Sequence, residues 1–214
     1  MNSDFSTFIT SLETALKRPL PGKVAQFKMA PYDRVLKLIA NAFTSKRTKE
    51  SAVLCLFYPK NREPHFSLIL RNTYKGVHSG QIGFPGGKVE EEDASFEQTA
   101  LRETEEEVGV QRDHVKIIGV LTDLYIPPSG FLVHPFIGYL ETAPDFIPDS
   151  NEVSKIIETP LSTLMDESIV GRKKIKVSSA NLKVKYPYFD IQGETVWGAT
   201  AMILSELKEI IKLT

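Results

Sequence analysis

Residues 84–110 read FPGGKVEEEDASFEQTALRETEEEVGV, and the rest of the chain is expected to fold around this stretch. It opens with a proline and two glycines, a turn signal at which backbone can approach a ligand closely. Ser95 followed by Gln98 is a capping-box pattern that predicts the start of a helix. Gly109 is placed to end that helix. The stretch therefore predicts a glycine turn that leads directly into one helix.

Two sides of this helix differ in chemistry. Glu103, Glu106 and Glu107 form an acidic stripe, whereas Glu97 and Glu105 point elsewhere and are expected to be solvated. Like charges at this spacing oppose folding, and a hard divalent cation would relieve them because carboxylate oxygens are its preferred ligands. The other side is expected to face the core, at about 100° per residue, through Phe96, Ala100, Leu101, Thr104 and Val108.

The alternative interpretation of the acidic stripe is an ordinary solvated helix face. Against it stands a joint pattern of a glycine turn, a capped helix, clustered carboxylates and a terminal glycine. Arg102 adds to this pattern because it can pair with Glu106 one turn later. We therefore favour a metal site on this helix.

Residues 102–110, RETEEEVGV, resemble the second half of the Nudix box. That box reads Gly, five residues, Glu, seven residues, then Arg-Glu-apolar-x-Glu-Glu-x-Gly-apolar. The first half departs from it, because the first Glu falls on Ala94 with Asp93 beside it. The interval from Gly87 to Arg102 is also one residue longer than in the standard box. This longer spacing is similar to the coenzyme A diphosphatase branch of the Nudix family.

Residues 78–87, HSGQIGFPGG, also resemble that branch, and the similarity continues through the PFIGYL and WGATA stretches. The branch signature has an Arg four residues before its Gly. Counted from Gly80, that position is Gly76 in this chain. Arg71 matches the Arg that follows an apolar strand in the branch, which implies a phosphate clamp. An edge salt bridge is the alternative role for Arg71.

The resemblance implies a Nudix-like α/β/α sandwich of the α/β class with a mixed β-sheet. Residues 1–45 are expected to form an N-terminal helical extension, and residues 46–214 the Nudix hydrolase domain. The extension includes an amphipathic helix with apolar residues from Phe5 to Leu16 and a second helix over 35–43.

The implied reaction is metal-assisted hydrolysis of a nucleoside diphosphate linked to another group. Glu103 and Glu107 would hold Mg²⁺ or Mn²⁺, with Glu106 directly or through water and the Gly87 carbonyl as a further ligand. Arg102 would orient the glutamates. The substrate implied by the branch is coenzyme A or acyl-CoA, cut to 4′-phosphopantetheine and 3′,5′-ADP.

A carboxylate is needed to take the proton from the attacking water, and Glu103 and Glu152 are both candidates. Glu152 is preferred over Glu158 as the residue outside the box, because the long loop before Glu152 can reach across a site. Solvated strand-end carboxylates are the alternative for both. The expected substrate contacts, besides Arg71, come from the glycine-rich loop and from an aromatic residue: Lys75, His78, Gln81 and Phe131.

Aromatic and basic groups outside the box have two interpretations each. Tyr125 and Phe131 flank a turn and either stack on an adenine ring or plug the space under the loop. Residues 171–188 predict a hairpin that is rich in Lys and free of acidic residues. Such a run is typical of an edge strand guarded by Lys, or it attracts a polyanionic substrate.

The whole chain fits a globular protein: it has 214 residues, 42% of them hydrophobic and 25% charged. Its net charge of −1 argues against a general nucleic-acid binder. A lone Cys55 excludes an intrachain disulfide and is expected to be buried in a strand. No targeting signal or long apolar run is present, so we expect a cytoplasmic protein that does not enter membranes.

Two rival functions remain. One is a Nudix module that senses a nucleotide without cleaving it, and the other is a hydrolase of ADP-ribose, NADH or another dinucleotide. An RNA-decapping enzyme is weaker, because no RNA-binding module is appended. The oligomeric state is left open, a homodimer included.

Overall fold

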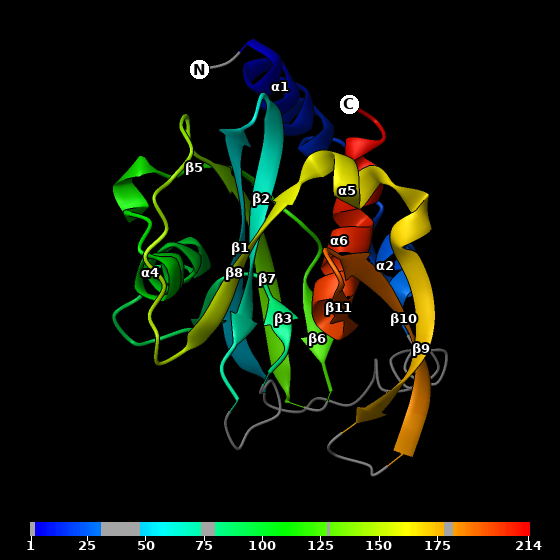
Figure 1. Cartoon of the computed structure of the whole chain (residues 1–214). Helices are drawn as coiled ribbons and strands as arrows, with labels where there is room; N and C mark the ends of the chain where they lie inside the picture. The colour runs from blue at the N-terminus through cyan, green and yellow to red at the C-terminus, as the bar shows by residue number, and fades with distance from the viewer. Residues whose placement is uncertain (1–2, 31–47, 74–79, 128, 178–181) are drawn as a thin grey trace.

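A mixed sheet forms the middle layer of the molecule (Figure 1). The structure is a computed structural model that describes residues 3–30, 48–73, 80–127, 129–177 and 182–214. In the sheet, β1 pairs in parallel with β7 and antiparallel with β2 and β4. The strands are β1 Lys49–Lys60, β2 Glu63–Arg71, β3 Ile82–Gly83, β4 Gly86–Lys88, β5 Lys116–Val120, β6 Leu124–Ile126, β7 Phe131–Tyr139 and β8 Val153–Pro160.

The hairpin between β1 and β2 is tighter than the sequence predicts. The stretch Pro59 to Pro64 is rich in charge and proline, which is typical of a longer turn, but these two prolines face each other in the ladder and the strands continue to Lys60 and Glu63. Only Asn61 and Arg62 turn the chain, at φ 51° and 64°. Two successive positive φ values match the twist of the flanking strands, so two residues are enough.

Helices cover both faces of the sheet, which confirms the α/β/α sandwich. Helix α4, Phe96–Val108, lies on one face, and α1, Ser3–Leu16, and α6, Gly198–Ile211, lie on the other (Figure 1). Successive side chains of β1 point to opposite faces of the sheet. Leu54, Leu56 and Tyr58 pack in the core under α4. Cys55 and Phe57 join the core on the opposite face.

The expected buried positions of the flanking elements are confirmed. Phe5, Ile9, Leu12 and Ala15 of α1 are buried in the core under α6. Cys55 is buried, and burial raises the pKa of its thiol. The second predicted helix, over 35–43, and the predicted boundary between residues 45 and 46 lie outside the described residues.

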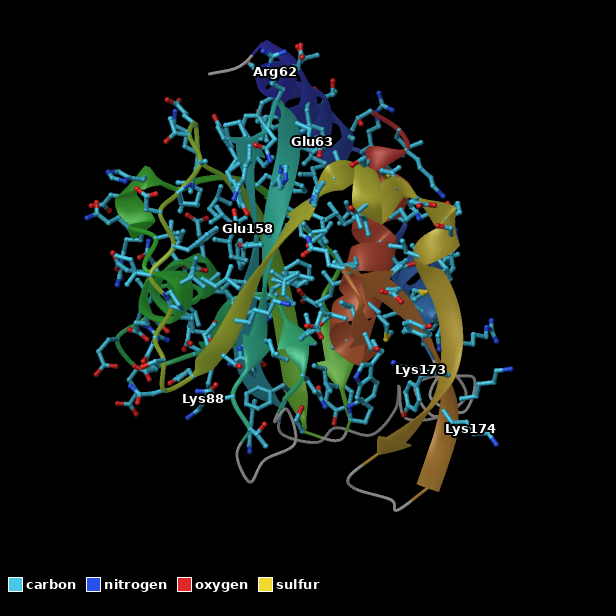
Figure 2. All side chains as sticks on the ribbon, in the orientation of Figure 1. Arg62, Glu63, Lys88, Glu158, Lys173 and Lys174 are labelled. Atoms are coloured by element: carbon cyan, nitrogen blue, oxygen red, sulfur yellow. The ribbon has the colours of Figure 1, made fainter. Side chains whose placement is uncertain are left out.

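A second, three-stranded antiparallel sheet follows β8 and a short helix α5, Leu161–Met165. It consists of β9 Val170–Val177, β10 Leu182–Ile191 and β11 Glu194–Trp197. The hairpin predicted over 171–188 is therefore confirmed, although its turn lies outside the described residues. Figure 2 shows Lys173 and Lys174 on the outer strand β9. Lys174 is exposed, whereas the Lys173 ammonium lies over the Tyr188 ring and donates to the Thr195 hydroxyl.

The remaining short elements connect these layers: α2 Gly22–Gln26 and the 3₁₀ turns Phe27–Met29, Arg112–His114 and Glu167–Ile169. None of the helices in the described residues is long and apolar enough to cross a membrane.

Candidate active site

Helix α4 begins and ends as the sequence predicts. The Ser95 hydroxyl accepts a hydrogen bond from the Gln98 backbone N–H at 3.2 Å. Gly109 takes a φ of 73° at the other end, and its N–H donates to the Glu105 carbonyl at 2.9 Å. A glycine adopts this left-handed conformation without the steric cost of a Cβ. Both ends of the acidic helix are therefore fixed by local chemistry.

One member of the predicted core face is wrong. Phe96 is 38% exposed, whereas Ala100, Leu101, Thr104 and Val108 are buried. Phe96 is the first residue of the helix, and its ring stacks on His134 of β7 with centroids 3.8 Å apart. At the helix end the ring is covered by this one stacking partner rather than by the sheet core.

Glu107 lies in the interior although it is part of the acidic stripe. Its side chain is 2% exposed, and Arg71 at the end of β2 donates Nη1–H to Oε1 at 2.7 Å. The Gly86 backbone N–H donates to Oε2 at 2.8 Å. Burial raises the pKa of Glu107 to about 7, and Arg71 opposes that rise. Glu107 is therefore a buried carboxylate with one oxygen bonded to an arginine and the other to a backbone N–H.

The glycine turn permits the closest contact in the site. A Cβ at Gly87 would lie 2.3 Å from the carboxylate carbon of Glu103, so any other residue would displace that carboxylate. A Cβ at Gly86 would lie 2.3 Å from the Ala52 carbonyl, and Gly86 has a φ of 146°. Because neither glycine has a Cβ, strand β4 can lie in close contact with both β1 and the acidic helix.

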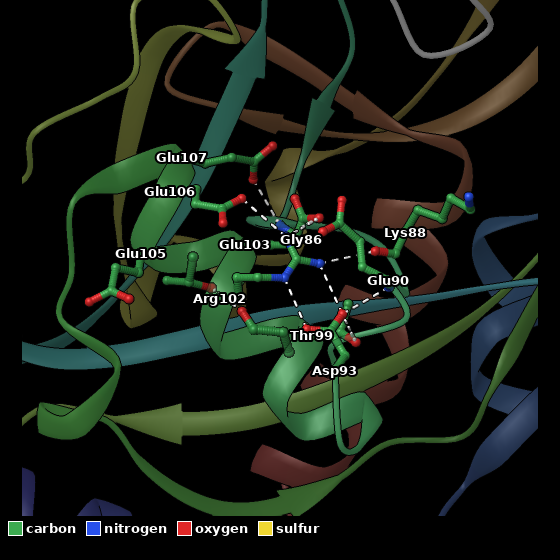
Figure 3. A network of polar contacts seen from close by, with 12 residues as sticks. Gly86, Lys88, Glu90, Asp93, Thr99, Arg102, Glu103, Glu105, Glu106 and Glu107 are labelled. Atoms are coloured by element: carbon green, nitrogen blue, oxygen red, sulfur yellow. Dashed lines mark hydrogen bonds and ion pairs between the residues drawn. The ribbon is translucent and has the colours of Figure 1, made fainter.

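Arg102 is the hub of the surrounding polar network (Figure 3). Its Nη1–H donates to Glu103 at 3.0 Å and to Glu106 at 3.1 Å. Its Nη2–H donates to the Lys88 carbonyl at 3.2 Å. The expected i, i+4 pair with Glu106 is thus present, and the guanidinium also bridges the helix to β4. One side chain holds two of the three stripe carboxylates.

Asp93 holds the far side of this guanidinium. Its two oxygens accept from Arg102 Nε and Nη2, each at 3.0 Å, and the Asp93 side chain is 5% exposed. The Glu90 N–H and the Thr99 hydroxyl also donate to Asp93. The Arg102 guanidinium holds the pKa of Asp93 well below its usual range. Asp93 therefore makes the ion pair with Arg102 that Ala94, at the position of the missing box Glu, cannot make.

Box spacing alone points to Asp93 only in part, because it stands one position before the expected Glu. Glu103 is 15% exposed, and burial raises its pKa while Arg102 opposes the rise. Glu106 is 57% exposed and turns toward Arg102. Glu105 points away and pairs with Arg112 at 2.6 Å.

The structure brings Gln81 and Glu152 to the same end of the sheet as Arg71. The Arg71 N–H donates to the Gln81 carbonyl at 3.1 Å, and Val153 pairs with Arg71 in the strand register. Glu152 is exposed there, and its carbonyl accepts from the Asn72 N–H at 2.8 Å.

Glu158 lies at the other end of β8. It accepts from the Tyr58 hydroxyl at 3.0 Å and pairs with Lys60 at 2.8 Å. Figure 2 shows it well away from Lys88, the residue that follows the glycine pair. Glu158 therefore lies at the opposite end of β8 from Arg71, and its carboxylate is already paired.

The other expected substrate contacts are less close or lie outside the described residues. Phe131 is the first residue of β7 and lies opposite Lys49, whose Nζ is 5.7 Å from the centroid of the Phe131 ring. Tyr125 of β6 pairs with Leu132 of β7. Lys75, His78 and Gly76 fall in residues 74–79, which the structure does not describe.

The donor set has the right chemistry for a hard divalent cation. Three carboxylates share one helix beside the glycine backbone, and two of them are largely buried. Among the residues that the structure describes, no three His, Cys, Asp or Glu side chains converge as they would around a metal ion. Arg71 and Arg102 hold the glutamates by ion pairs in this arrangement. The residues fit a cation once the carboxylates turn toward it.

Known proteins are similar to this chain over most of its length. The profile of the NUDIX domain matches residues 48–175. A protein named "Uncharacterized Nudix hydrolase NudL" from Photorhabdus laumondii is 32% identical over 169 residues, which cover 79% of this chain and 88% of that protein.

Two solved structures share the fold at low identity. A Nudix hydrolase from M. smegmatis, RenU, has a TM-score of 0.54 at 13% identity, and the aligned region covers 77% of this chain and 86% of the RenU chain. A MutT protein from Methanosarcina mazei has a TM-score of 0.50 at 18% identity and covers 78% of this chain and 96% of its own.

Proposed function

This chain belongs to the NUDIX domain family and is a Nudix hydrolase, and from that premise we propose a metal-dependent diphosphatase that cuts coenzyme A or acyl-CoA. The products would be 4′-phosphopantetheine and 3′,5′-ADP. The observation that carries the hydrolytic part is the buried Glu107 beside Glu103, at the contact of helix α4 with the Gly86–Gly87 backbone. A solvated acidic face would not place a carboxylate at 2% exposure.

Glu103, Glu106 and Glu107 would hold Mg²⁺ or Mn²⁺, with the Gly87 carbonyl as a further ligand. When bound, the cation would neutralise the diphosphate and lower the pKa of a water molecule. Arg102 positions Glu103 and Glu106, and Asp93 fixes Arg102 from behind. This pair keeps the carboxylates in place without entering the reaction.

The proton from the attacking water needs a carboxylate acceptor, and Glu152 or Glu103 would take it. Glu152 is exposed and directly precedes Val153, which pairs with Arg71, so its side chain is accessible at the end of β8 where Arg71 lies. Glu103 is held by Arg102 at 3.0 Å, which favours a ligand role. We therefore assign the base to Glu152.

The choice of coenzyme A rests on sequence resemblance to one branch of the family. The HSGQIGFPGG run, the longer box with Asp93 and the WGATA segment support it. Gly76 opposes it, because the branch has an Arg there that would contact a phosphate. A charged hydrogen bond of this kind contributes roughly 1.5–3 kcal/mol, or about one to two decades in affinity. We therefore expect cleavage of coenzyme A with a weak KM.

The test compares coenzyme A, its 3′-dephospho form, ADP-ribose and NADH, each with Mg²⁺ or with EDTA, and identifies the products by mass spectrometry. The expected result is that coenzyme A is cleaved with Mg²⁺ but not with EDTA, and that Gly76→Arg lowers the KM for coenzyme A. Much faster turnover of ADP-ribose or NADH than of both coenzyme A forms would contradict the substrate assignment. Tight nucleotide binding without turnover under any condition would instead favour a sensor module.

A further inference from the structure

Arg71 occupies a carboxylate oxygen of Glu107 that a cation at this site would need. It ends strand β2, and its guanidinium donates Nη1–H to Glu107 Oε1 at 2.7 Å and Nη2–H to the Gly86 carbonyl at 2.6 Å. The Arg71 side chain is 22% exposed, whereas that of Glu107 is 2% exposed. Arg71 is thus the charge that compensates a carboxylate with almost no access to water.

A guanidinium and a divalent cation compete for one buried carboxylate. The second oxygen of Glu107 already accepts from the Gly86 N–H at 2.8 Å, so the oxygen that Arg71 holds is the one a cation would take. Two positive groups on one carboxylate repel each other strongly where water is excluded. Binding of a cation therefore favours departure of the guanidinium.

The two arginines of the site differ in how firmly they are held. Arg102 is 12% exposed and donates to Asp93, Glu103, Glu106 and the Lys88 carbonyl. Arg71 has one carboxylate and one side-chain contact to backbone. Loss of one carboxylate leaves Arg102 with two others, but it leaves Arg71 with none. Arg71 is therefore the one of these two that a cation can release.

We propose that Arg71 is an internal counter-ion of Glu107 which a divalent cation displaces, and that the released guanidinium binds the diphosphate of the nucleotide. This inference rests on the metal site of the proposed function. It adds that one side chain serves both states, with the carboxylate as partner before the cation binds and a phosphate as partner afterwards. Bound cation and bound nucleotide then strengthen each other, because each favours the same position of Arg71.

The first test measures Mn²⁺ binding by electron paramagnetic resonance in the absence of nucleotide. Arg71→Gln removes the competitor and is expected to bind Mn²⁺ about tenfold more tightly, as loss of a charged hydrogen bond suggests. Arg112→Gln is the matched control, because it removes an arginine from a glutamate of the same helix outside the site, and it should bind Mn²⁺ as the wild type does. Glu107→Gln should bind Mn²⁺ weakly.

The second test measures affinity for α,β-methylene-ADP, a diphosphate analogue that hydrolysis cannot cut, with and without Mg²⁺. In the wild type Mg²⁺ should tighten binding of the analogue. In Arg71→Gln that gain should fall by about tenfold. An equal gain in both proteins would overturn the proposal.

Arg71→Gln leaves Glu107 without its ion pair, so a measurement on the intact wild type is also needed. Nitrogen-15 signals of the Arg71 guanidinium should report slower bond rotation without Mg²⁺ and faster rotation with it. Unchanged Arg71 signals at saturating Mg²⁺ would overturn the proposal, as would unchanged Mn²⁺ affinity in Arg71→Gln. Failure of the wild type to bind Mn²⁺ at all, or equal binding by Glu107→Gln, would overturn the metal site itself.

Discussion

Two runs of like charge in this chain have opposite surroundings. Two members of the acidic run on α4 turn inward and are held by arginines: Glu107 is 2% exposed and Glu103 15%, whereas Glu106 is 57% exposed. The basic run on β9 and β10 turns outward, with Arg172, Lys174 and Lys185 exposed. In the register of that hairpin, Lys174 lies directly opposite Lys185.

The difference shows what separates a site from a solvated face. Like charges on a surface repel weakly, because water and salt screen them. The same charges in the interior need partners, and each partner in turn becomes fixed. The contrast predicts that substitutions in the acidic run change activity strongly and that substitutions in the basic run change it little.

The largest expected effect is that of Glu107→Gln. This change keeps the shape of the side chain but removes the charge that a cation would bind. Groups behind a metal site typically contribute 10- to 100-fold in activity, so loss of a direct ligand should cost more than about a hundredfold in kcat/KM. Steady-state kinetics at saturating Mg²⁺ provide the measurement.

Glu105→Gln is the matched control for that change. Glu105 lies on the same helix, carries the same charge and pairs with Arg112 at the surface. It should retain activity within about twofold, since surface substitutions seldom matter. Equal losses in the two variants would mean that charge on the helix, rather than position in the site, supports activity.

Asp93→Asn comes next in size. It removes the bidentate partner of Arg102 but no expected ligand, so activity should fall by about 10- to 100-fold, as for other groups behind a metal site. Weaker Mn²⁺ binding should accompany the loss, because Glu103 and Glu106 are then held less firmly. A variant that loses stability but keeps full specific activity and Mn²⁺ affinity would make Asp93 structural only.

The same ion pair predicts how stability depends on pH. The folded pKa of Asp93 is lowered, chiefly by Arg102, so its contribution is fully present above the unfolded pKa of about 3.9. The contribution is lost as the pH falls from there toward the lower folded pKa. The difference in unfolding free energy between wild type and Asp93→Asn should be about 1.5–3 kcal/mol at pH 7. Denaturant unfolding between pH 7 and pH 3 should show this difference shrinking below pH 4, and a constant difference would contradict the assignment.

Much of the fold follows from local patterns in the chain. The cap at Ser95, the terminal Gly109 and the alternation along β1 are local, and each is confirmed. The two-residue turn at Asn61 and Arg62 was not predicted, because the prolines on either side suggested a longer loop. Ladder pairing of two prolines across a hairpin depends on the whole sheet, and no local signal gives it.

The site was predictable in its residue types but not in its pairings. The box spacing places three glutamates beside Arg102, and the structure shows that Arg102 donates to two of them, Glu103 and Glu106. The box spacing does not predict that Arg71, distant in sequence, pairs with Glu107. Nor did it show which glutamate is buried, because burial depends on how the glycine turn and β2 pack against the helix. Long-range contacts of this kind come from the fold alone.

The smallest expected effect is that of Lys185→Glu, which tests whether the basic run only guards an edge. It converts the like-charged pair with Lys174 into an opposite pair, so the melting temperature should rise by about 1 °C. If the run guards an edge, kcat/KM stays within about twofold of the wild type at any salt concentration.

If the run instead attracts the polyanionic substrate, kcat/KM of Lys185→Glu falls at low ionic strength and recovers at high ionic strength, because salt screens the attraction. Lys185→Gln is the matched control, since it removes the positive charge without adding a negative one and should show about half of any such loss. A salt-dependent fall in both variants would place the basic hairpin within reach of the substrate's path. The two runs would then serve the same polyanionic substrate: the basic run would attract it, and the acidic run would hold the cation that neutralises its diphosphate.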